Sequence, residues 1–397
     1  MEAHTFLLQL VVILFSARAL GELAAYCKAP SVVGELLTGI LIGPSVLGWI
    51  ELSTPIHLLA QIGIILLLFE VGIETDVGRL TASGLNALFV AVVGIAAPFV
   101  LGFLLSYYCF SLTLLVSLFI ACTLTATSIG ITLRVLRDLQ QQNSLAAQII
   151  TGAAVLDDIV GIIFLTILYE FSTVGTVDLV NAGKILLFIL IYFLIAPFAA
   201  KAVSHVIKKW DEKSEIPGLL PTAIISLILF FAWLAHKLGA PELLGGFAAG
   251  LAMSRQFVLP FGKLGPADPE FSHKIEKQMR PIIHLFAPIF FVAVGLSINL
   301  KEINWGSPFI WMLTAALFAA ALLGKLVSGF AVVKEKIRTK LIIGTAMVPR
   351  GEVGLVFANI GLTVGVFKDD IYTALILVIV LTTLLAPFAL RELCKRS

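Results

Sequence analysis

Residues 151–161 read TGAAVLDDIVG and place two adjacent aspartates, Asp157 and Asp158, inside a long apolar stretch. The surrounding segment, 144–171, is long enough to cross a bilayer as a helix, because roughly 20 apolar residues span the hydrocarbon core. Backbone polar groups must be satisfied internally in hydrocarbon, so such a segment has to be helical. A carboxylate at its centre costs about 2.5–3.5 kcal/mol to insert, which makes such residues rare unless they are paired or functional.

The composition of the whole chain also indicates a membrane protein. Of its 397 residues, 59% are hydrophobic and 13% are charged, and the mean hydropathy is +1.04. A soluble globular protein carries about 25% charged residues. The net charge of +2, without a basic run, argues against a nucleic-acid partner. The four cysteines have neither metal-ligand nor disulfide-framework spacing, and we expect them to pack as small apolar residues.

The apolar stretches predict an all-α membrane protein with about thirteen transmembrane helices. They are expected at 5–26, 30–48, 55–73, 84–109, 111–136, 144–171, 179–207, 217–237, 241–259, 281–300, 308–333, 339–363 and 370–390. No Lys or Arg precedes the first stretch and no cleavage site follows it, so we expect a membrane helix there and not a signal peptide.

The distribution of basic residues predicts the orientation. Most of the 27 lysines and arginines fall at one set of loops, and only four fall at the opposite set: Lys184, Lys237, Lys301 and Lys368. Cytoplasmic loops carry an excess of Lys and Arg. We therefore expect a multi-pass protein of the cell inner membrane, with its N-terminus outside and its C-terminus in the cytoplasm.

Short sequence matches indicate an internal repeat. Residues 29–39 (APSVVGELLTG) match residues 240–250 (APELLGGFAAG); weaker matches pair 71–73 with 294–296 and 130–131 with 354–355. Each match relates a predicted helix to the one seven helices later. Because seven is odd, the two copies would face opposite ways across the bilayer. Inverted six-helix repeats joined by a linking helix are typical of secondary transporters.

Five ionisable residues lie well inside the predicted helices: Asp157, Asp158, Lys325, Arg350 and Glu352. They could merely pair and hold helices together, but five charges in three helices favour a functional role. Adjacent helical residues point about 100° apart, so one aspartate can lean on a neighbouring helix while the other faces a water-filled cavity.

The chemistry of these groups suits a monovalent cation and protons. Sodium prefers oxygen ligands, and Asp157 and Asp158 are the expected ligands of a transported ion. Removal from water disfavours a charged carboxylate, so it can exchange a proton for a metal ion. Lys325 lies among the small residues Gly324 and Ser328, which allow a close helix approach. Its ammonium group could neutralise an aspartate or lose its proton; it could also extend to the interface.

Two segments are expected to break their helices. Residues 123–130 read TLTATSIG, and residues 347–354 read MVPRGEVG, in which proline removes a helical hydrogen bond. Broken helices that cross at the midplane expose dipole ends and carbonyl groups. Arg350 and Glu352 would compensate these ends or each other, while Thr127 and Ser128 offer hydroxyl groups near the ion.

Other acidic residues in or near the predicted helices suggest less. Glu70 and Glu74, near the end of segment 55–73, are expected to pair or to lie at the interface, and no role is assigned to Glu35. No order of Ser, His and Asp suggests hydrolysis, so the chain is not expected to be an enzyme.

Together these motifs resemble the bacterial monovalent cation:proton antiporter superfamily over nearly the whole chain. The paired aspartates with Gly324-Lys325, the segment 125–130 and Pro349-Arg350-Gly351-Glu352 carry the resemblance. Asp157-Asp158 with a lysine is similar to the electrogenic sodium/proton branch, whereas the glutathione-gated potassium efflux branch typically has Gln-Asp at this position.

The resemblance implies a scaffold that dimerises and a mobile core. The scaffold would comprise 1–80 and 211–304, and the core 81–172 and 305–397, joined by a linking helix at 173–210. It also implies that Asp158 exchanges cation and proton, that Asp157 pairs with Lys325, and that the protein is a homodimer in the bilayer without a resident cofactor.

We therefore expect electrogenic exchange of Na⁺ or Li⁺ for protons by alternating access. Potassium/proton antiport remains an alternative. Sodium-coupled uptake of an organic anion would need a roomier polar cavity. An intramembrane aspartyl protease needs carboxylates from two different helices, and no filter-like motif indicates a channel or a sensor.

Overall fold

The computed structural model is all-helical in the residues that it describes, which are 3–27, 29–74, 84–174, 179–214, 217–254, 269–302 and 305–395. The first half contains α1 (Ala3–Tyr26), α2 (Ser31–Ile42), α3 (Thr54–Glu74), α5 (Gly84–Leu104), α6 (Leu114–Thr125), α7 (Ile129–Asp138), α8 (Leu145–Val174) and α9 (Leu179–Asp211). The second half contains α10 (Leu219–Lys237), α11 (Glu242–Ala252), α12 (Pro269–Leu296), α13 (Pro308–Ser328), α14 (Ile337–Ala346), α15 (Glu352–Thr363) and α16 (Asp369–Lys395). A π-helical turn at Leu105–Cys109 extends α5, and short 3₁₀ turns occupy Leu300–Glu302 and Gly329–Ala331.

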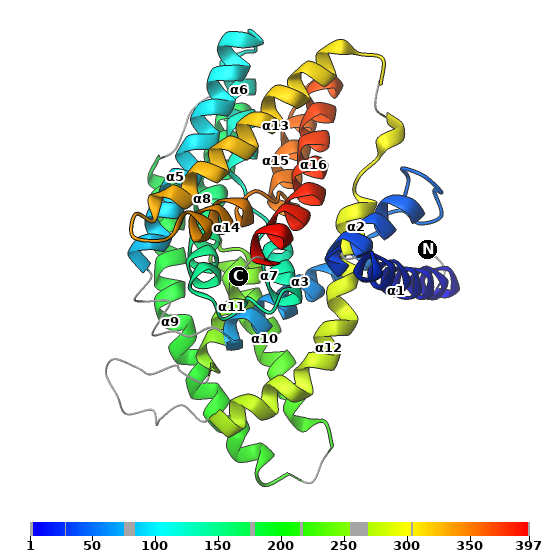
Figure 1. The fold of residues 1–397 in the computed structure, drawn as a ribbon. Coiled ribbons are helices and arrows are strands. Elements are labelled where there is room, and N and C mark those ends of the chain that lie inside the picture. Colours follow the sequence, from blue (N-terminus) through cyan, green and yellow to red (C-terminus); the bar gives the residue numbers. More distant parts are fainter. Residues whose placement is uncertain are drawn as a thin grey trace.

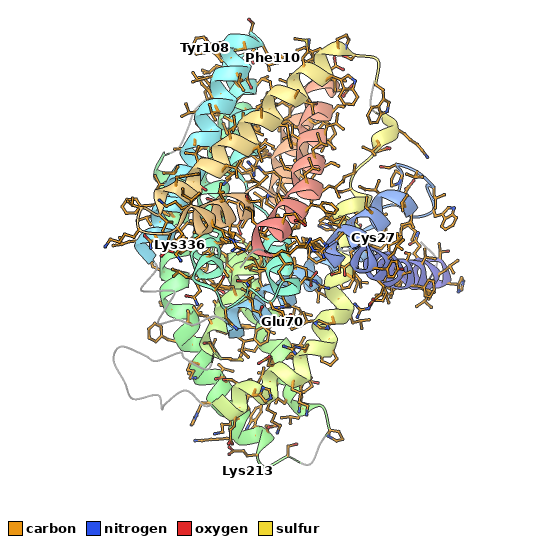
Figure 2. All side chains as sticks on the ribbon, in the orientation of Figure 1. Cys27, Glu70, Tyr108, Phe110, Lys213 and Lys336 are labelled. Atoms are coloured by element: carbon orange, nitrogen blue, oxygen red, sulfur yellow. The ribbon has the colours of Figure 1, made fainter. Side chains whose placement is uncertain are left out.

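Helix length and composition fit a membrane protein. Within the described part of the chain, nine helices are long and apolar enough to cross a bilayer, and three shorter apolar helices accompany them. Tyr108 and Phe110 lie at one end of the molecule and Lys213 lies at the opposite end (Figure 2). The prediction of an all-α membrane protein is therefore confirmed.

The helices form two groups that are discontinuous in sequence (Figure 1). Group I consists of α1–α3 and α10–α12, which contact one another. Group II consists of α5–α8 and α13–α16; α13 lies against both α5 and α16. Helix α9 contacts α8 on one side and α10 and α11 on the other. Helix α7 belongs to group II through α8 and α16, but it also contacts α2 and α3 of group I.

Two helices of group II are interrupted. Residues 126–128 separate α6 from α7, and residues 347–351 separate α14 from α15. The backbone N–H of Ser128 donates to the carbonyl of Pro349 at 2.8 Å. The hydroxyl of Thr132 donates to the carbonyl of Ala346 at 2.6 Å. The two interruptions therefore lie against each other, and each satisfies backbone groups that the other leaves outside a helix.

Some predicted helix ends differ from the observed ones. Helix α2 ends at Ile42 and not at residue 48, because Gly43 and Pro44 stop it. Helix α12 begins at Pro269, well before the predicted 281, since its first three turns are polar and escape a hydropathy criterion. Helix α11 ends at Ala252, and residues 255–259 of the predicted stretch lie outside the described residues.

Glycines allow the helices of group I to touch backbone to backbone. A Cβ atom on Gly39 of α2 would lie 2.1 Å from the carbonyl oxygen of Val292 in α12. A Cβ atom on Gly250 of α11 would lie 2.1 Å from the carbonyl oxygen of Phe69 in α3. Small residues at such contacts drive helix association in lipid, where the hydrophobic effect between helices is absent.

Candidate functional site

Asp157 and Asp158 lie on α8, and both are buried. The Nζ atom of Lys325, on α13, lies 2.7 Å from Oδ2 of Asp157. The side chain of Lys325 is 0% exposed and that of Asp157 is 1% exposed. Residues 168 positions apart in the sequence thus form an ion pair in the interior of group II. A buried charge is stable only when it is paired and hydrogen-bonded, so each partner requires the other.

The close approach of α5 and α13 places Lys325. A Cβ atom on Gly324 would lie 2.6 Å from the backbone nitrogen of Pro98. A Cβ atom on Gly94, one turn earlier in α5, would lie 3.6 Å from Nζ of Lys325. Gly94 and Pro98 belong to none of the motifs that the sequence indicated. A glycine and a proline four residues apart in an apolar stretch were the available signal.

Thr127 connects the α6–α7 break to this ion pair. Its hydroxyl donates to Oδ2 of Asp157 at 2.7 Å, and the carbonyl of Met347 lies 3.3 Å from the same hydroxyl. Ser128 instead packs against the other break, where a Cβ atom on Gly351 would lie 2.5 Å from its hydroxyl oxygen. Of the two predicted hydroxyl residues, the structure therefore places Thr127 directly on an aspartate.

Arg350 lies at the second break and is fully buried. Its Nη2 donates to the carbonyl of Leu124 at 2.6 Å, and its Nη1 donates to the carbonyls of Met347 and Val348. The Leu124 carbonyl belongs to the last turn of α6, and the Met347 and Val348 carbonyls lie just beyond the end of α14. The guanidinium therefore places positive charge at two negative dipole ends and provides hydrogen bonds there.

Two further residues lie at this break. The hydroxyl of Thr383, on α16, donates to the carbonyl of Arg350. No sequence signal distinguishes Thr383 from other hydroxyl residues in its apolar helix. Glu352 begins α15, but its side chain lies outside the described part of the structure, so its predicted interaction with Arg350 is not described.

The arrangement combines two carboxylates and one amine in a site removed from bulk water. The carboxylate of Asp157 accepts from an ammonium group and a hydroxyl on the same oxygen atom. Asp158 follows it on α8 and is 3% exposed. Such a set of groups can bind a small cation through oxygen atoms, or bind protons, but the desolvation of charge disfavours empty charged carboxylates.

A cavity of about 690 Å³ lies between the two groups at the end of the molecule that is predicted to face outside. Group I contributes His57 and Gln61 of α3 and Phe290 of α12, and group II contributes Leu165 of α8 and Asn359 of α15.

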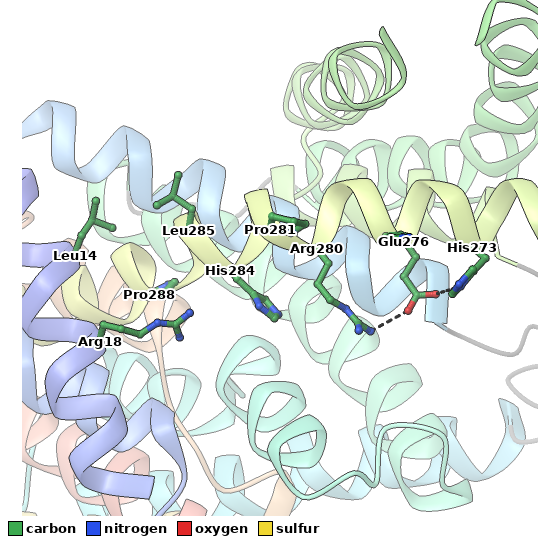
Figure 3. Close-up of a pocket in the computed structure, with 10 residues that line it drawn as sticks. Leu14, Arg18, His273, Glu276, Arg280, Pro281, His284, Leu285 and Pro288 are labelled. Carbon is green, nitrogen blue, oxygen red and sulfur yellow. Dashed lines mark hydrogen bonds and ion pairs between the residues drawn. The ribbon is translucent and has the colours of Figure 1, made fainter. Parts of the chain in front are cut away.

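A second cavity lies at the predicted cytoplasmic end, within group I. It is lined by α1 and α12 (Figure 3). There Arg280 reaches Glu276 at 2.9 Å, and the side chains of Arg18 and His284 lie nearby.

Comparisons with known proteins agree with this architecture. A family model described as "Sodium/hydrogen exchanger, transmembrane" matches residues 7–396. The chain is 34% identical to the Na(+)/H(+)-K(+) antiporter GerN of Bacillus cereus over 96% of this chain and 94% of that protein. It is 33% identical to the high-affinity Na(+)/H(+) antiporter NhaS3 of Synechocystis sp., covering 97% and 89% of the two chains.

A solved structure has the same fold. The sodium proton antiporter MjNhaP1 from Methanocaldococcus jannaschii superposes with a TM-score of 0.75, with 17% sequence identity, over 100% of this chain and 98% of the other. The chain contains two interrupted helices that meet beside the buried Asp157–Lys325 pair, and the exchanger family model matches nearly its full length. The chain therefore belongs to the transmembrane sodium/hydrogen exchanger family.

Proposed function

We propose that this protein exchanges Na⁺ or Li⁺ for protons by alternating access at one site, where Asp158 binds either the cation or a proton. The observation that carries the proposal is the fully buried Asp157–Lys325 ion pair beside Asp158. The names of two relatives at 33–34% identity, both sodium/proton antiporters, support it. The GerN name also includes K⁺, which keeps potassium as a second candidate cation.

The proposed cycle starts from the proton-loaded state, in which Lys325 is paired with Asp157. A cation from the cytoplasm displaces the proton on Asp158 and the ammonium from Asp157, and Lys325 then releases its proton. The loaded core moves, the cation leaves outside, and two protons bind. Asp157 and Asp158 both supply oxygen ligands to the transported ion.

The charge count makes this cycle electrogenic. Two protons enter for each cation that leaves, so one net charge crosses the membrane in each cycle. Each such charge is driven by about 2.3 kcal/mol per 100 mV. The membrane potential would therefore drive cation extrusion even when the pH gradient is small.

Thr127, Ser128, Arg350 and Glu352 support the crossing of the broken helices in this proposal. Thr127 restrains the carboxylate of Asp157 through its hydrogen bond. Arg350 joins the ends of α6 and α14, which keeps the two breaks in register. Ser128 packs where the second break contains Gly351, and Glu352 is assigned the N-terminal end of α15. These residues hold the site in shape, and the ion is bound by the aspartates.

We also infer thirteen membrane helices arranged as two inverted six-helix repeats, with α9 as the linking helix. Repeat-related glycines make equivalent contacts, which supports this symmetry. Gly39 of α2 approaches Gly295 of α12, and their repeat equivalents Gly250 of α11 and Gly72 of α3 approach each other in the same way. Each copy thus packs its second helix on the third helix of the other copy.

Group I corresponds to the scaffold and group II to the mobile core. The assigned boundaries are 1–80 and 211–304 for the scaffold, 81–172 and 305–397 for the core, and 173–210 for the linking segment. The scaffold would form a homodimer. The positive-inside bias supports an inner-membrane protein with its N-terminus outside and its C-terminus in the cytoplasm.

The direct test is cation-induced proton movement in proteoliposomes, reported by a pH-sensitive dye, with Na⁺, Li⁺ and K⁺ each added in turn. Wild type is expected to respond to Na⁺ or Li⁺. Asp158→Asn is expected to abolish the response, whereas Asp369→Asn, which makes the same change on an exposed side chain of α16, should retain it. A lack of response to every cation between about pH 6 and 9 would refute antiport.

The role of Lys325 is tested separately. Lys325→Gln removes the group proposed to carry the second proton, so exchange should become electroneutral or be lost. If Lys325→Gln vesicles still moved two protons per cation and still responded to membrane potential, lysine would not be an obligatory proton carrier.

A further inference from the structure

Charged residues of α7 connect group II to group I at the predicted cytoplasmic end. Arg134 Nη2 lies 3.4 Å from Oε1 of Glu35 on α2. Arg137 Nη1 forms an ion pair with Oε2 of Glu70 on α3. Both pairs therefore bridge the two helix groups, in contrast to the Asp157–Lys325 pair, which lies within group II.

Asp138, at the end of α7, adds a third bridge. Its Oδ2 accepts hydrogen bonds from the backbone N–H and the hydroxyl of Ser31 on α2, at 3.2 and 2.7 Å. Its Oδ1 lies 3.3 Å from Nε of Arg134, one turn earlier in α7. We call these side chains the inner latch: Ser31, Glu35, Glu70, Arg134, Arg137 and Asp138.

Most of the charge in the inner latch is withdrawn from water. Glu35, Glu70 and Arg134 are 2%, 1% and 8% exposed. A buried ion pair is stable while its geometry is held, but the separation of the partners leaves uncompensated charges that require rehydration. The two groups can therefore part at this end only when water enters between α7 and the scaffold helices.

The opposite end of the same interface is open. The 690 Å³ cavity described above, which we call the outer cavity, separates α3 and α12 of group I from α8 and α15 of group II. Between the cavity and the latch, α7 begins with an apolar contact in which a Cβ atom on Gly130 would lie 2.6 Å from Cδ1 of Ile64. The two helix groups are thus held together by ion pairs at the inner end and separated by the cavity at the outer end.

We propose that the inner latch holds the cytoplasmic side closed in the outward-facing state and must open once in every transport cycle. Its arginines and carboxylates are positioning residues, because they set the balance between the two orientations of the core and contact no transported ion. The proposal rests on the alternating-access cycle proposed above. Weakening the latch shifts the protein toward the inward-facing state, so the outer cavity becomes less accessible.

The test measures accessibility and needs no transport. Gln61→Cys is introduced into the outer cavity of the full-length protein, in a background in which Cys27, Cys109, Cys122 and Cys394 are replaced. Right-side-out vesicles are treated with a membrane-impermeant thiol reagent. Glu70→Gln and Arg137→Gln are each expected to slow labelling by about fivefold or more, which corresponds to a coupling free energy above about 1 kcal/mol.

Glu212→Gln is the matched control. It removes an exposed carboxylate near the same end of the molecule, and its ion-pair partner Lys208 lies one turn earlier in the same segment, so the pairs of the inner latch are unchanged. Labelling at the cavity should then match the unaltered background. If Glu70→Gln and Arg137→Gln also labelled at the background rate, the latch would be refuted.

A cross-link provides an independent measurement that holds even if Glu70→Gln or Arg137→Gln folds poorly. Ser31→Cys/Asp138→Cys places thiols where the native polar atoms lie 2.7 Å apart. A short bifunctional reagent, applied to a variant that retains Gln61, should trap the inner side closed and stop transport. Continued transport after complete cross-linking would contradict the latch. Accessibility shifts without cation-driven proton movement would instead uphold the latch and refute the proposed antiport.

Discussion

The Asp157–Lys325 pair and the Arg137–Glu70 pair use the same chemistry in different mechanical settings. Both join a buried carboxylate to a basic side chain. The first connects α8 to α13 within group II, so both partners would move together. The second connects α7 of group II to α3 of group I, so any relative motion of the groups separates its partners. One pair is therefore suited to bind and release ions and protons, and the other to control a conformational change.

The basic residues of the two pairs also differ in their exposure to water. Lys325 is fully buried, whereas the side chain of Arg137 is 17% exposed and can regain water when the groups part. The penalty for a broken pair depends on how far its charges remain from water. Mutations at the two places are thus expected to differ in size and in kind.

The largest effect is expected from breaking the pair within group II. Lys325→Met leaves Asp157 charged and buried, which should destabilise the protein by about 3–5 kcal/mol. The double variant Asp157→Asn/Lys325→Met removes both charges and should recover most of that loss. Thermal unfolding in detergent measures both. Equal stability of Lys325→Met and wild type would show that Asp157 does not need the ammonium group, because either water reaches the carboxylate or a proton replaces the lysine.

Arg350→Lys sharpens the comparison by keeping a charge inside group II while removing the guanidinium fork. A lysine cannot reach the carbonyls at the ends of both α6 and α14, and each buried acceptor left without a donor costs about 1–3 kcal/mol. We expect lower thermal stability together with lost transport. The outer-cavity labelling rate should stay unchanged, because no bridge to group I is affected.

Gly324→Ala tests the packing that places Lys325. Its Cβ would meet the backbone of Pro98 at 2.6 Å and force α5 and α13 apart, which should cost about 1–3 kcal/mol. Gly161→Ala on α8 is the matched control, since its Cβ would meet Val353 at an ordinary 3.7 Å. Transport assays and unfolding curves should separate the two variants; a tolerated Gly324→Ala would argue against this contact as the determinant of lysine position.

The smallest effect is expected from an exposed ion pair that lies neither inside group II nor between the two groups. Lys208, in the last turn of α9, and Glu212, just after its end, lie 3.5 Å apart, with side chains 35% and 58% exposed. Exposed pairs of this kind contribute about 0.3–0.5 kcal/mol and weaken with salt. Lys208→Ala should leave transport, cavity labelling and stability near wild-type values. A loss comparable to that of Lys325→Met would mean that burial is not what distinguishes the pairs.

Much of the site followed from local properties of the sequence. The cost of charge in hydrocarbon identified Asp157, Asp158, Lys325 and Arg350 without knowledge of their neighbours. The proline and glycines of segment 347–354 indicated a break, because their effect on a helix is intrinsic. The resemblance to a known family, and not the residues themselves, assigned the lysine to Asp157 and left Asp158 for the ion.

Other features depended on contacts that no local pattern encodes. Glu70 was expected to pair or lie at the interface, and Glu35 had no assigned role, yet both meet arginines of α7. Arg134 and Arg137 resembled ordinary topology signals, because a basic residue near a helix end is usual on the cytoplasmic side.

The sequence by itself thus determined that the chain is a bundle of membrane helices, where charge enters the membrane, and which helices break. These follow from hydropathy and backbone chemistry, which each segment carries alone. Only the tertiary structure decided which carboxylate meets which base, and whether a pair lies within one helix group or between two. Those outcomes depend on how segments more than a hundred residues apart are brought together, as with α8 and α13, which the Asp157–Lys325 pair joins.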